Sequence, residues 1–267
     1  MTSTYLDRIL AAHRERAAAD QRNLDALIDA ARRHSSTDPT RGFRAALLEA
    51  SAADGIAVIA EVKRRSPSKG PLAPDLDPAE LARAYAAGGA ACFSVLTDVE
   101  FFGGSPDDLV AARRAGGRPV LRKDFTVCAQ DVCDARLMGA DCVLLIAAAL
   151  DDAQLRDFRS LAVELGLDAL VEVHDEAELD RAVAAGADLI GVNQRDLVTF
   201  QVDQQRAVRM APQMPAGVVR VAESGIRGPD DAAVLAKAGY HALLVGESLV
   251  TSGDPAAGVK ALRAAAG

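Results

Sequence analysis

The sequence predicts an α/β protein in which eight parallel strands, each followed by a helix, close into a barrel. Short apolar runs recur along most of the chain, and amphipathic segments with helical spacing separate them. Runs that are apolar along their whole length are typical of a parallel sheet buried on both faces. The count of eight favours a closed (β/α)8 TIM barrel over an open sheet. The runs are Ala57–Ala60, Ala91–Leu96, Pro119–Leu121, Cys142–Ala147, Ala169–Val173, Leu189–Val192, Val218–Val221 and Ala242–Val245.

The segments between these runs carry helix signals at both ends. Asp77, Asp151 and Asp175 stand where an N-cap is expected, at the start of segments with helical apolar spacing. Several segments end in glycine just before the next run, and a left-handed glycine commonly ends a helix. These glycines are Gly88–Gly89, Gly139, Gly166, Gly186 and Gly239.

The first fifty residues or so do not follow the repeat. Residues 7–34 have helical periodicity, and residues 37–55 predict a turn followed by another helix. We expect residues 1–52, approximately, to form a helical extension that packs on the barrel. Because no Pro- and Ser-rich linker divides the chain, we expect residues 1–267 to form one domain.

Composition and charge limit the classes of function. The net charge of −8 and the pI near 5.1 argue against a general nucleic-acid binder. The longest apolar run, Cys142–Leu150, is too short to span a bilayer, and the N-terminal residues show no secretory signal, so we expect a cytoplasmic protein. The four cysteines lack metal-ligand spacing, so we expect no metal site. Cys92 and Cys142 lie inside apolar runs and are interpreted as small buried residues.

Polar side chains gather after the apolar runs, at one end of almost every predicted strand. Active sites of (β/α)8 barrels form at the C-terminal ends of the strands. Glu61 and Lys63 follow the first run, Lys123 the third, and Glu172 lies at the end of the fifth. Two lysines and two glutamates in a partly dry cavity can shift one another's pKa values and act as general acids and bases. The alternative is a structural ion-pair network at the mouth of the barrel.

The seventh and eighth runs are followed by "ESG", beginning at Glu223, and "GES", beginning at Gly246. Loops at these two positions often bind phosphate through backbone N–H groups and a helix N-terminus. Glycine lets the backbone approach a ligand closely. Ordinary strand-to-helix turns are the alternative, but the occurrence of both loops together favours phosphate.

Four cations lie within seven residues, and on an acidic protein such a patch indicates a small anionic ligand. The segment "RSPSKG" predicts a mobile loop in which Lys69 could close over an anion. Arg64 and Arg65 could equally be solvated loop charges.

His174 is interpreted as a surface or capping residue. Asp98 and Asp124 could be helix caps as easily as site residues, and Phe101, Phe102 and Phe125 either core residues or a wall for an aromatic ligand.

Seven motifs resemble, in order, those of the indole-3-glycerol phosphate synthase family of tryptophan biosynthesis. They are "VIAEVKRRSPSKG", "FSVLTDVEFFGGS", "PVLRKDF", "LVEVH", "GVNQRDL", "VAESGI" and "LLVGESLV". The resemblance runs from about residue 40 to the C-terminus, and a helical N-terminal extension is also typical of the family. It implies a carboxy-lyase that converts 1-(2-carboxyphenylamino)-1-deoxyribulose 5-phosphate to indole-3-glycerol phosphate, with loss of CO₂ and water and without a cofactor.

The resemblance also implies a role for each matching residue. Lys123 would be the general acid in ring closure and Glu172 the general base. Glu61 and Lys63 would assist proton transfer and hold the carboxylate, and which lysine serves the dehydration step stays open. The residues implied for the sugar hydroxyls, the substrate carboxylate and the aromatic pocket are Asn193, Arg195, Glu223, Ser224, Ser66, Pro67, Phe102, Phe125 and Leu144.

Gly225, Gly246 and Glu247 would give backbone N–H groups to the phosphate. Glu247 stands at a family position that can be serine. A contact from the backbone would survive this difference, whereas a contact from the side chain would not.

Alternatives stay open beside this interpretation. One is another phosphosugar enzyme, such as phosphoribosylanthranilate isomerase, but its chemistry calls for a Cys/Asp pair where this chain has Lys and Glu. Another is a non-catalytic phosphosugar binder, which would need the phosphate loops but not Lys123 and Glu172. A nucleotide-binding open sheet would need a GxGxxG after the first strand, which is missing. We expect a monomer that binds a small phosphosugar and neither nucleic acid nor membrane.

Overall fold

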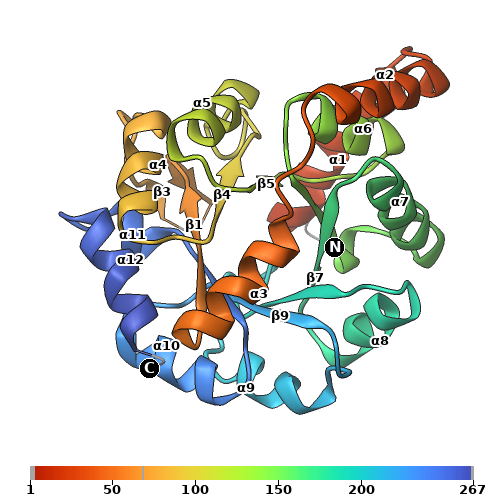
Figure 1. The fold of residues 1–267 in the computed structure, drawn as a ribbon. Coiled ribbons are helices and arrows are strands. Elements are labelled where there is room, and N and C mark those ends of the chain that lie inside the picture. The colour runs from red at the N-terminus through yellow and green to blue at the C-terminus, as the bar shows by residue number, and fades with distance from the viewer. Residues whose placement is uncertain (1–3, 68, 266–267) are drawn as a thin grey trace.

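The computed structural model describes residues 4–67 and 69–265 (Figure 1). Within these residues, eight parallel strands form a closed barrel in the order β1-β10-β9-β8-β7-β6-β5-β4. Each strand falls on one of the eight predicted runs, so the predicted (β/α)8 barrel is confirmed. The strands are β1 (Ala57–Val62), β4 (Cys92–Leu96), β5 (Val120–Lys123), β6 (Cys142–Ile146), β7 (Asp168–Val173), β8 (Leu189–Asn193), β9 (Val219–Glu223) and β10 (Ala242–Val245).

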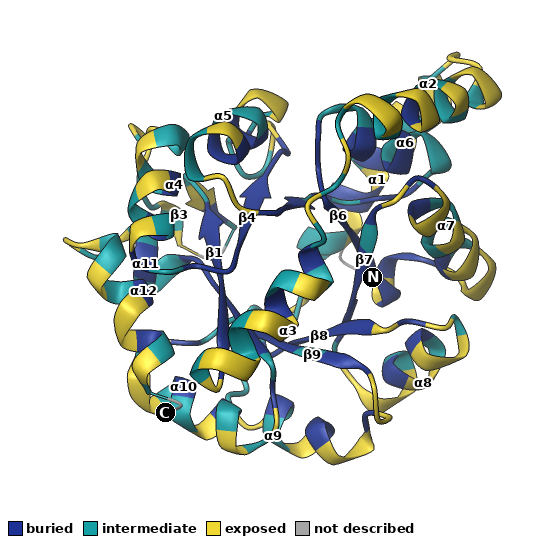
Figure 2. Ribbon diagram, viewed as in Figure 1, coloured by how far each residue is buried: buried dark blue, intermediate teal, exposed yellow. Residues whose placement is uncertain are grey.

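Helices follow the strands and cover the outside of the barrel, where their outer faces are exposed (Figure 2). The predicted N-caps Asp77, Asp151 and Asp175 are confirmed, since each side chain accepts a backbone N–H of its helix. Among the predicted helix-ending glycines, Gly88 alone has a right-handed backbone, with φ −72°. The helices are α4 (Pro78–Ala87), α5 (Pro106–Gly116), α6 (Ala129–Leu137), α7 (Asp152–Glu164), α8 (Glu176–Ala184), α9 (Arg206–Met210), α10 (Pro229–Lys237), α11 (Glu247–Val250) and α12 (Pro255–Ala264), with 3-10 turns η1 (Ala147–Ala149) and η2 (Ala211–Gln213).

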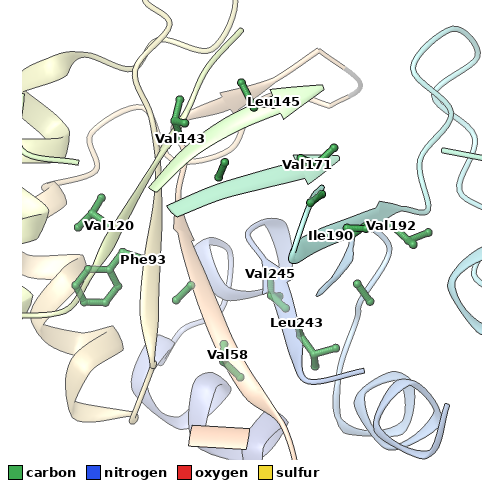
Figure 3. Packing of buried hydrophobic residues seen from close by; sticks show 14 of the residues in the cluster. Val58, Phe93, Val120, Val143, Leu145, Val171, Ile190, Val192, Leu243 and Val245 are labelled. Atoms are coloured by element: carbon green, nitrogen blue, oxygen red, sulfur yellow. The ribbon is translucent and has the colours of Figure 1, made fainter. Parts of the chain in front are cut away.

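Side chains alternate along each strand between two buried layers. Val58, Phe93 and Val171 belong to the outer layer, which packs against the helices (Figure 3). Ile59 and Leu170 belong to the inner layer, which fills the barrel. Because successive strand residues point to opposite faces, the same alternation turns every second residue at the C-terminal ends toward the barrel axis.

The extension contains three helices in its described part, α1 (Tyr5–Ala19), α2 (Leu24–Thr37) and α3 (Phe43–Asp54). Residues 7–34, predicted as one helical stretch, are therefore divided between two helices. The break has a local cause: the Asn23 side chain accepts the Ala26 N–H and starts α2, while the Asp20 carboxylate accepts the Arg22 N–H just before it.

Helix α3 closes the N-terminal end of the barrel, and it lies across the ring of strands in Figure 1. Phe43 and Leu47 are fully buried in the inner layer. The backbone N–H of Arg41 donates to Asp141 at 2.8 Å, and that of Arg44 donates to Asp168 at 2.8 Å, close to where β6 and β7 begin. Carboxylates at the N-terminal end of a helix also suit its dipole.

The cationic segment after β1 differs in part from its prediction. Its described residues form a short antiparallel hairpin of β2 (Arg65–Ser66) and β3 (Gly70–Pro71). Arg64 is not a solvated charge, because its guanidinium binds the Asp108 carboxylate at the start of α5 and the Leu76 carbonyl. Arg65 is exposed, as expected for a loop charge.

Replacement of Leu47 by alanine should lower the free energy of unfolding by about 2–5 kcal/mol, because it leaves a cavity beneath the barrel. Leu48, the next residue on α3, is 36% exposed and is the matched control. Its alanine variant should lose about 1 kcal/mol or less. Urea denaturation of both variants measures the difference, and equal losses would mean that α3 does not seal the barrel.

Candidate active site

A cavity of about 810 Å³ opens at the C-terminal end of the barrel. It draws on the ends of all eight strands and on the segments that follow them. All sixteen residues predicted for the site line this one cavity, so the structure brings the whole set together. They are Glu61, Lys63, Ser66, Pro67, Phe102, Lys123, Phe125, Leu144, Glu172, Asn193, Arg195, Glu223, Ser224, Gly225, Gly246 and Glu247.

Glu61 and Lys63 form an ion pair on one wall of the cavity. Lys63 Nζ donates to Glu61 Oε1 at 2.5 Å, and Ser94 Oγ donates to Glu61 Oε2 at 3.2 Å. Burial alone would raise the pKa of Glu61, but Lys63 and Lys123 hold it below its ordinary value. The pair therefore presents a carboxylate and an ammonium side by side.

Lys123 and Glu172 form a second pair at the centre of the site. Lys123 Nζ donates to Glu172 Oε2 at 3.3 Å, and Asn193 Nδ2 donates to Glu172 Oε1 at 3.1 Å. Although burial opposes both shifts, Glu172 and its neighbouring glutamates raise the pKa of Lys123, and Lys123 lowers the pKa of Glu172. Both groups are thus held in their charged forms, which suits a proton donor beside a base.

Glu223 behaves differently from the other two buried carboxyl groups. Its Oε2 lies 3.9 Å from Lys123 Nζ, while its Oε1 is buried without a hydrogen-bond partner among the described residues. Burial, followed by the negative charge of Glu172, raises its pKa well above the ordinary value, so this group holds its proton more tightly than an exposed glutamate does. Room for this carboxyl group exists because Gly191 lies opposite: a Cβ there would stand 2.0 Å from Glu223 Oε1.

The loops after β9 and β10 form one end of the cavity. Ser224 has a left-handed backbone, with φ 67°, which is rare for a residue other than glycine and costs conformational energy. Gly225 follows with φ 73°. Gly246 precedes α11, and Glu247 begins it. Lys69 reaches this end from the β2–β3 hairpin, with its Nζ 3.7 Å from Glu247 Oε1.

The other end of the cavity is apolar. The rings of Phe102 and Phe125 face each other at a tilt, with 6.3 Å between centroids, and Pro67 and Leu144 also line the space. Phe101 does not line the cavity. It packs edge-on against Tyr5, with 6.0 Å between ring centroids.

Several cavity residues were not predicted from the sequence. Tyr5, Leu6 and Ile9 reach the cavity from α1, so the extension forms part of its wall. Leu197 and Phe200 come from the loop after β8. The helical spacing of α1 shows that it has an apolar face, but nothing in it tells which part of the barrel that face covers.

Asp98 and Asp124 lie on the cavity wall and tie it to α1. His13 Nε2 lies 3.0 Å from Asp98 Oδ2 and 3.8 Å from Asp124 Oδ1, a cluster compact enough to hold a metal ion. The carboxylates have other partners, however. Asp98 Oδ1 accepts the backbone N–H groups of Phe101 and Phe102, as a cap would, and Asp124 Oδ2 binds Arg122 at 3.1 Å and the Thr97 hydroxyl at 2.5 Å. We interpret the cluster as a hydrogen-bonded joint between α1 and the cavity wall.

The family model described as indole-3-glycerol phosphate synthase matches residues 6–262, almost the whole chain. The chain belongs to this family. Indole-3-glycerol phosphate synthase of a Nocardioides species is 57% identical over 223 residues, which cover 84% of this chain and 83% of the relative. Indole-3-glycerol phosphate synthase of Mycobacteroides abscessus is 50% identical over 254 residues, which cover 95% of this chain and 92% of the relative.

Solved structures with low sequence identity share the fold of this indole-3-glycerol phosphate synthase family member. 3-Hexulose-6-phosphate synthase matches with a TM-score of 0.61 at 19% identity, over 79% of this chain and 99% of that one. Thiamine phosphate pyrophosphorylase from Pyrococcus furiosus matches with a TM-score of 0.60 at 17% identity, over 80% and 97%. At these identities the likeness supports the barrel and nothing finer.

Replacement of Glu223 by glutamine should raise the melting temperature at pH 8, by roughly 2–4 °C for each kcal/mol gained. The pKa of this buried carboxyl group is higher in the folded protein than in the unfolded chain, so the folded protein binds more protons there and the wild type loses stability as pH rises above the ordinary glutamate range. The difference between variant and wild type should therefore shrink as pH falls toward the ordinary glutamate range. Calorimetry at pH 5 and pH 8, with the exposed Glu49→Gln as control, measures it. A variant that is less stable than the wild type at pH 8 would contradict the assignment.

Proposed function

We propose that this cavity carries out the indole-3-glycerol phosphate synthase reaction with Lys123 as general acid and Glu172 as general base. The observation that carries the proposal is the 3.3 Å hydrogen bond from Lys123 Nζ to Glu172 Oε2 in the cavity wall. It joins a charged donor and a charged acceptor where both can reach one substrate. The substrate is 1-(2-carboxyphenylamino)-1-deoxyribulose 5-phosphate, and the products are indole-3-glycerol phosphate, CO₂ and water.

The reaction needs an acid first and a base later. The ring carbon that bears the carboxylate attacks the ketone carbon of the sugar chain, and Lys123 gives its proton to the carbonyl oxygen. Loss of CO₂ returns an electron pair to the ring. The new hydroxyl group then leaves as water after protonation, and Glu172 takes the proton that is lost as the indole forms. Lys63, paired with Glu61, is the second ammonium group available for the dehydration step.

The two ends of the cavity suit the two ends of this substrate. The apolar end, with Phe102 and Phe125, fits the aromatic ring. The end formed by Gly225, Gly246 and Glu247 offers backbone N–H groups to the phosphate. Asn193, Arg195, Glu223 and Ser224 stand between them, where hydroxyl groups and the carboxylate would lie, and Ser66 and Leu144 complete the wall.

The alternatives lose support from the cavity's composition. All four cysteines are in the described part of the chain, and none lines the cavity, which disfavours the Cys/Asp chemistry of a phosphoribosylanthranilate isomerase. Burial raises the pKa of Cys92 and Cys142, as expected for structural thiols. A binder without catalysis would have no need of two opposed ammonium–carboxylate pairs deep in its pocket.

We further propose that the protein acts as a cytoplasmic monomer formed by a single domain over residues 1–267. Among the described residues, no helix combines the length and the apolar character needed to cross a membrane. The net charge of −8 supports a small-molecule substrate over nucleic acid.

Replacement of Lys123 by alanine, or of Glu172 by glutamine, should lower kcat by about 10²–10⁴-fold, because each change removes a group that transfers a proton. Continuous fluorescence of the indole product measures turnover. Lys260→Ala, an exposed site on α12, is the control and should keep full activity. Near-normal kcat in either site variant would refute its assignment, and tight binding without turnover in the wild type would point to a non-catalytic binder.

Replacement of Gly225 by alanine should raise KM roughly 10–100-fold, the effect of losing hydrogen bonds to a charged phosphate. A Cβ at this left-handed residue would stand 2.4 Å from Val202 Cγ1, so the loop must shift. Gly217 is also left-handed, with φ 85°, but a Cβ there would meet open space. Gly217→Ala is therefore the matched control for backbone strain, and equal KM values in the two variants would argue against a phosphate at Gly225.

A further inference from the structure

We infer that His174 is a positioning residue for the base, and that a Glu178–His174–Glu172 chain holds the Glu172 carboxylate in place and in its charged form. The inference rests on the proposed role of Glu172. His174 does not line the cavity, so it acts through Glu172 and does not contact the substrate. The family resemblance gave His174 no role.

The position of His174 follows from the alternation of strand residues. It comes two residues after Glu172, directly beyond the end of β7, so both side chains point to the same face. Its Nε2 lies 3.4 Å from Glu172 Oε1. Its Nδ1 lies 3.0 Å from Glu178 Oε2, and its backbone N–H donates to the same oxygen at 2.8 Å. Glu178, in the first turn of α8, thus fixes both the ring and the chain of His174.

The imidazole is largely shielded from solvent, and its Nε2 faces the base. Its side chain is 12% exposed, and its Nε2 has no hydrogen-bond partner in the part of the chain that the structure describes. Glu172 already accepts hydrogen bonds at both oxygens, from Lys123 and from Asn193. The contact from His174 is therefore an added charge at ion-pair distance, directed at the oxygen that Asn193 binds.

The surrounding groups favour a protonated ring. Two carboxylates, Glu172 on β7 and Glu178 on α8, face the imidazole, and although burial opposes the shift they raise the pKa of His174 to about 10. Asp175 is occupied as the cap of α8. Arg181, further along α8, directs its guanidinium to Asp152 and to the carbonyls of Ala147 and Leu150. His174 in turn contributes, after Lys123, to lowering the pKa of Glu172.

A second cation matters because Lys123 does not stay charged through the reaction. When Lys123 gives its proton to the substrate, Glu172 loses the ammonium 3.3 Å away and becomes more basic. It would then compete for a proton before the base is needed. His174, which gives up no proton in this scheme, remains as the charge that keeps Glu172 ionised.

The first test is an NMR titration of the histidine rings in the 15N-labelled wild-type protein. The chain has four histidines, and His174→Asn identifies the signal by its loss. We expect His174 to be doubly protonated at pH 7 and to titrate well above pH 8. In Glu172→Gln its titration should move toward the ordinary histidine range. A neutral ring at pH 7 would overturn the inference without any measurement of activity.

The second test is the dependence of kcat/KM on pH. In His174→Asn the acidic limb of this pH profile, where kcat/KM falls as Glu172 is protonated, should move up by about one pH unit. At low pH this shift corresponds to a roughly tenfold loss of kcat/KM, while kcat/KM at high pH stays near the wild-type value. A role in folding alone would lower activity equally at every pH. His34→Asn, the same substitution on α2 outside the cavity, is the matched control and should leave the limb unchanged.

The outcomes separate this inference from the proposed function. If Glu172→Gln retains turnover, the role of Glu172 fails and the inference falls with it. If Glu172→Gln is inactive while His174→Asn shows the wild-type acidic limb, the inference alone is wrong. Should His174→Asn not fold, Glu178→Gln carries the test, because it removes the partner of Nδ1 and should shift the limb in the same direction. If the acidic limb of the kcat/KM profile of Glu178→Gln stays at the wild-type pH, the inference is overturned as well.

Discussion

The alternation of side chains along the strands of a closed barrel is the constraint on which the site depends. Every second residue points inward, so the inward positions near the C-terminal ends share one small space. These positions hold Glu61 at the end of β1 and Lys63 just beyond it, Lys123 on β5, Glu172 on β7 and Glu223 on β9. Charged groups that lie so near one another in a partly desolvated space need partners of opposite charge. Against the effect of burial, Lys63 and Lys123 lower the pKa values of Glu61 and Glu172, whereas burial raises the pKa of the third carboxyl group, on Glu223.

The strands and the polar end of the barrel could be predicted because they depend on local patterns. Apolar runs mark strands wherever a sheet is buried on both faces, and the residue after each run indicates what reaches the cavity. Thus Lys123 and Glu172, far apart in the chain, were placed together correctly. Arg64 could not be interpreted in this way, because its partner Asp108 belongs to a helix 44 residues further on.

The rest depends on packing that no local pattern contains. The periodicity of α1 predicts a helix but not that Tyr5 would stand over the cavity, and the run of residues 7–34 gave no sign that α1 and α2 would separate. His174 was interpreted as a surface or capping residue because a single histidine is ambiguous in sequence. Its proposed role follows from its contact with Glu178, one helical turn away on α8, and from the low exposure of its ring beside Glu172.

The extension reaches both ends of the barrel, and this makes the two ends of the chain unequal as points of attachment. Tyr5 stands at the cavity wall, whereas Arg263, near the end of α12, pairs with Asp54 at the end of α3, beside the sealed end of the barrel. Anything joined ahead of Thr4 is tethered within reach of the substrate's entrance. A tag or fusion partner joined after α12 starts from the opposite end of the molecule, so carboxyl-terminal attachment is the choice that leaves the entrance clear.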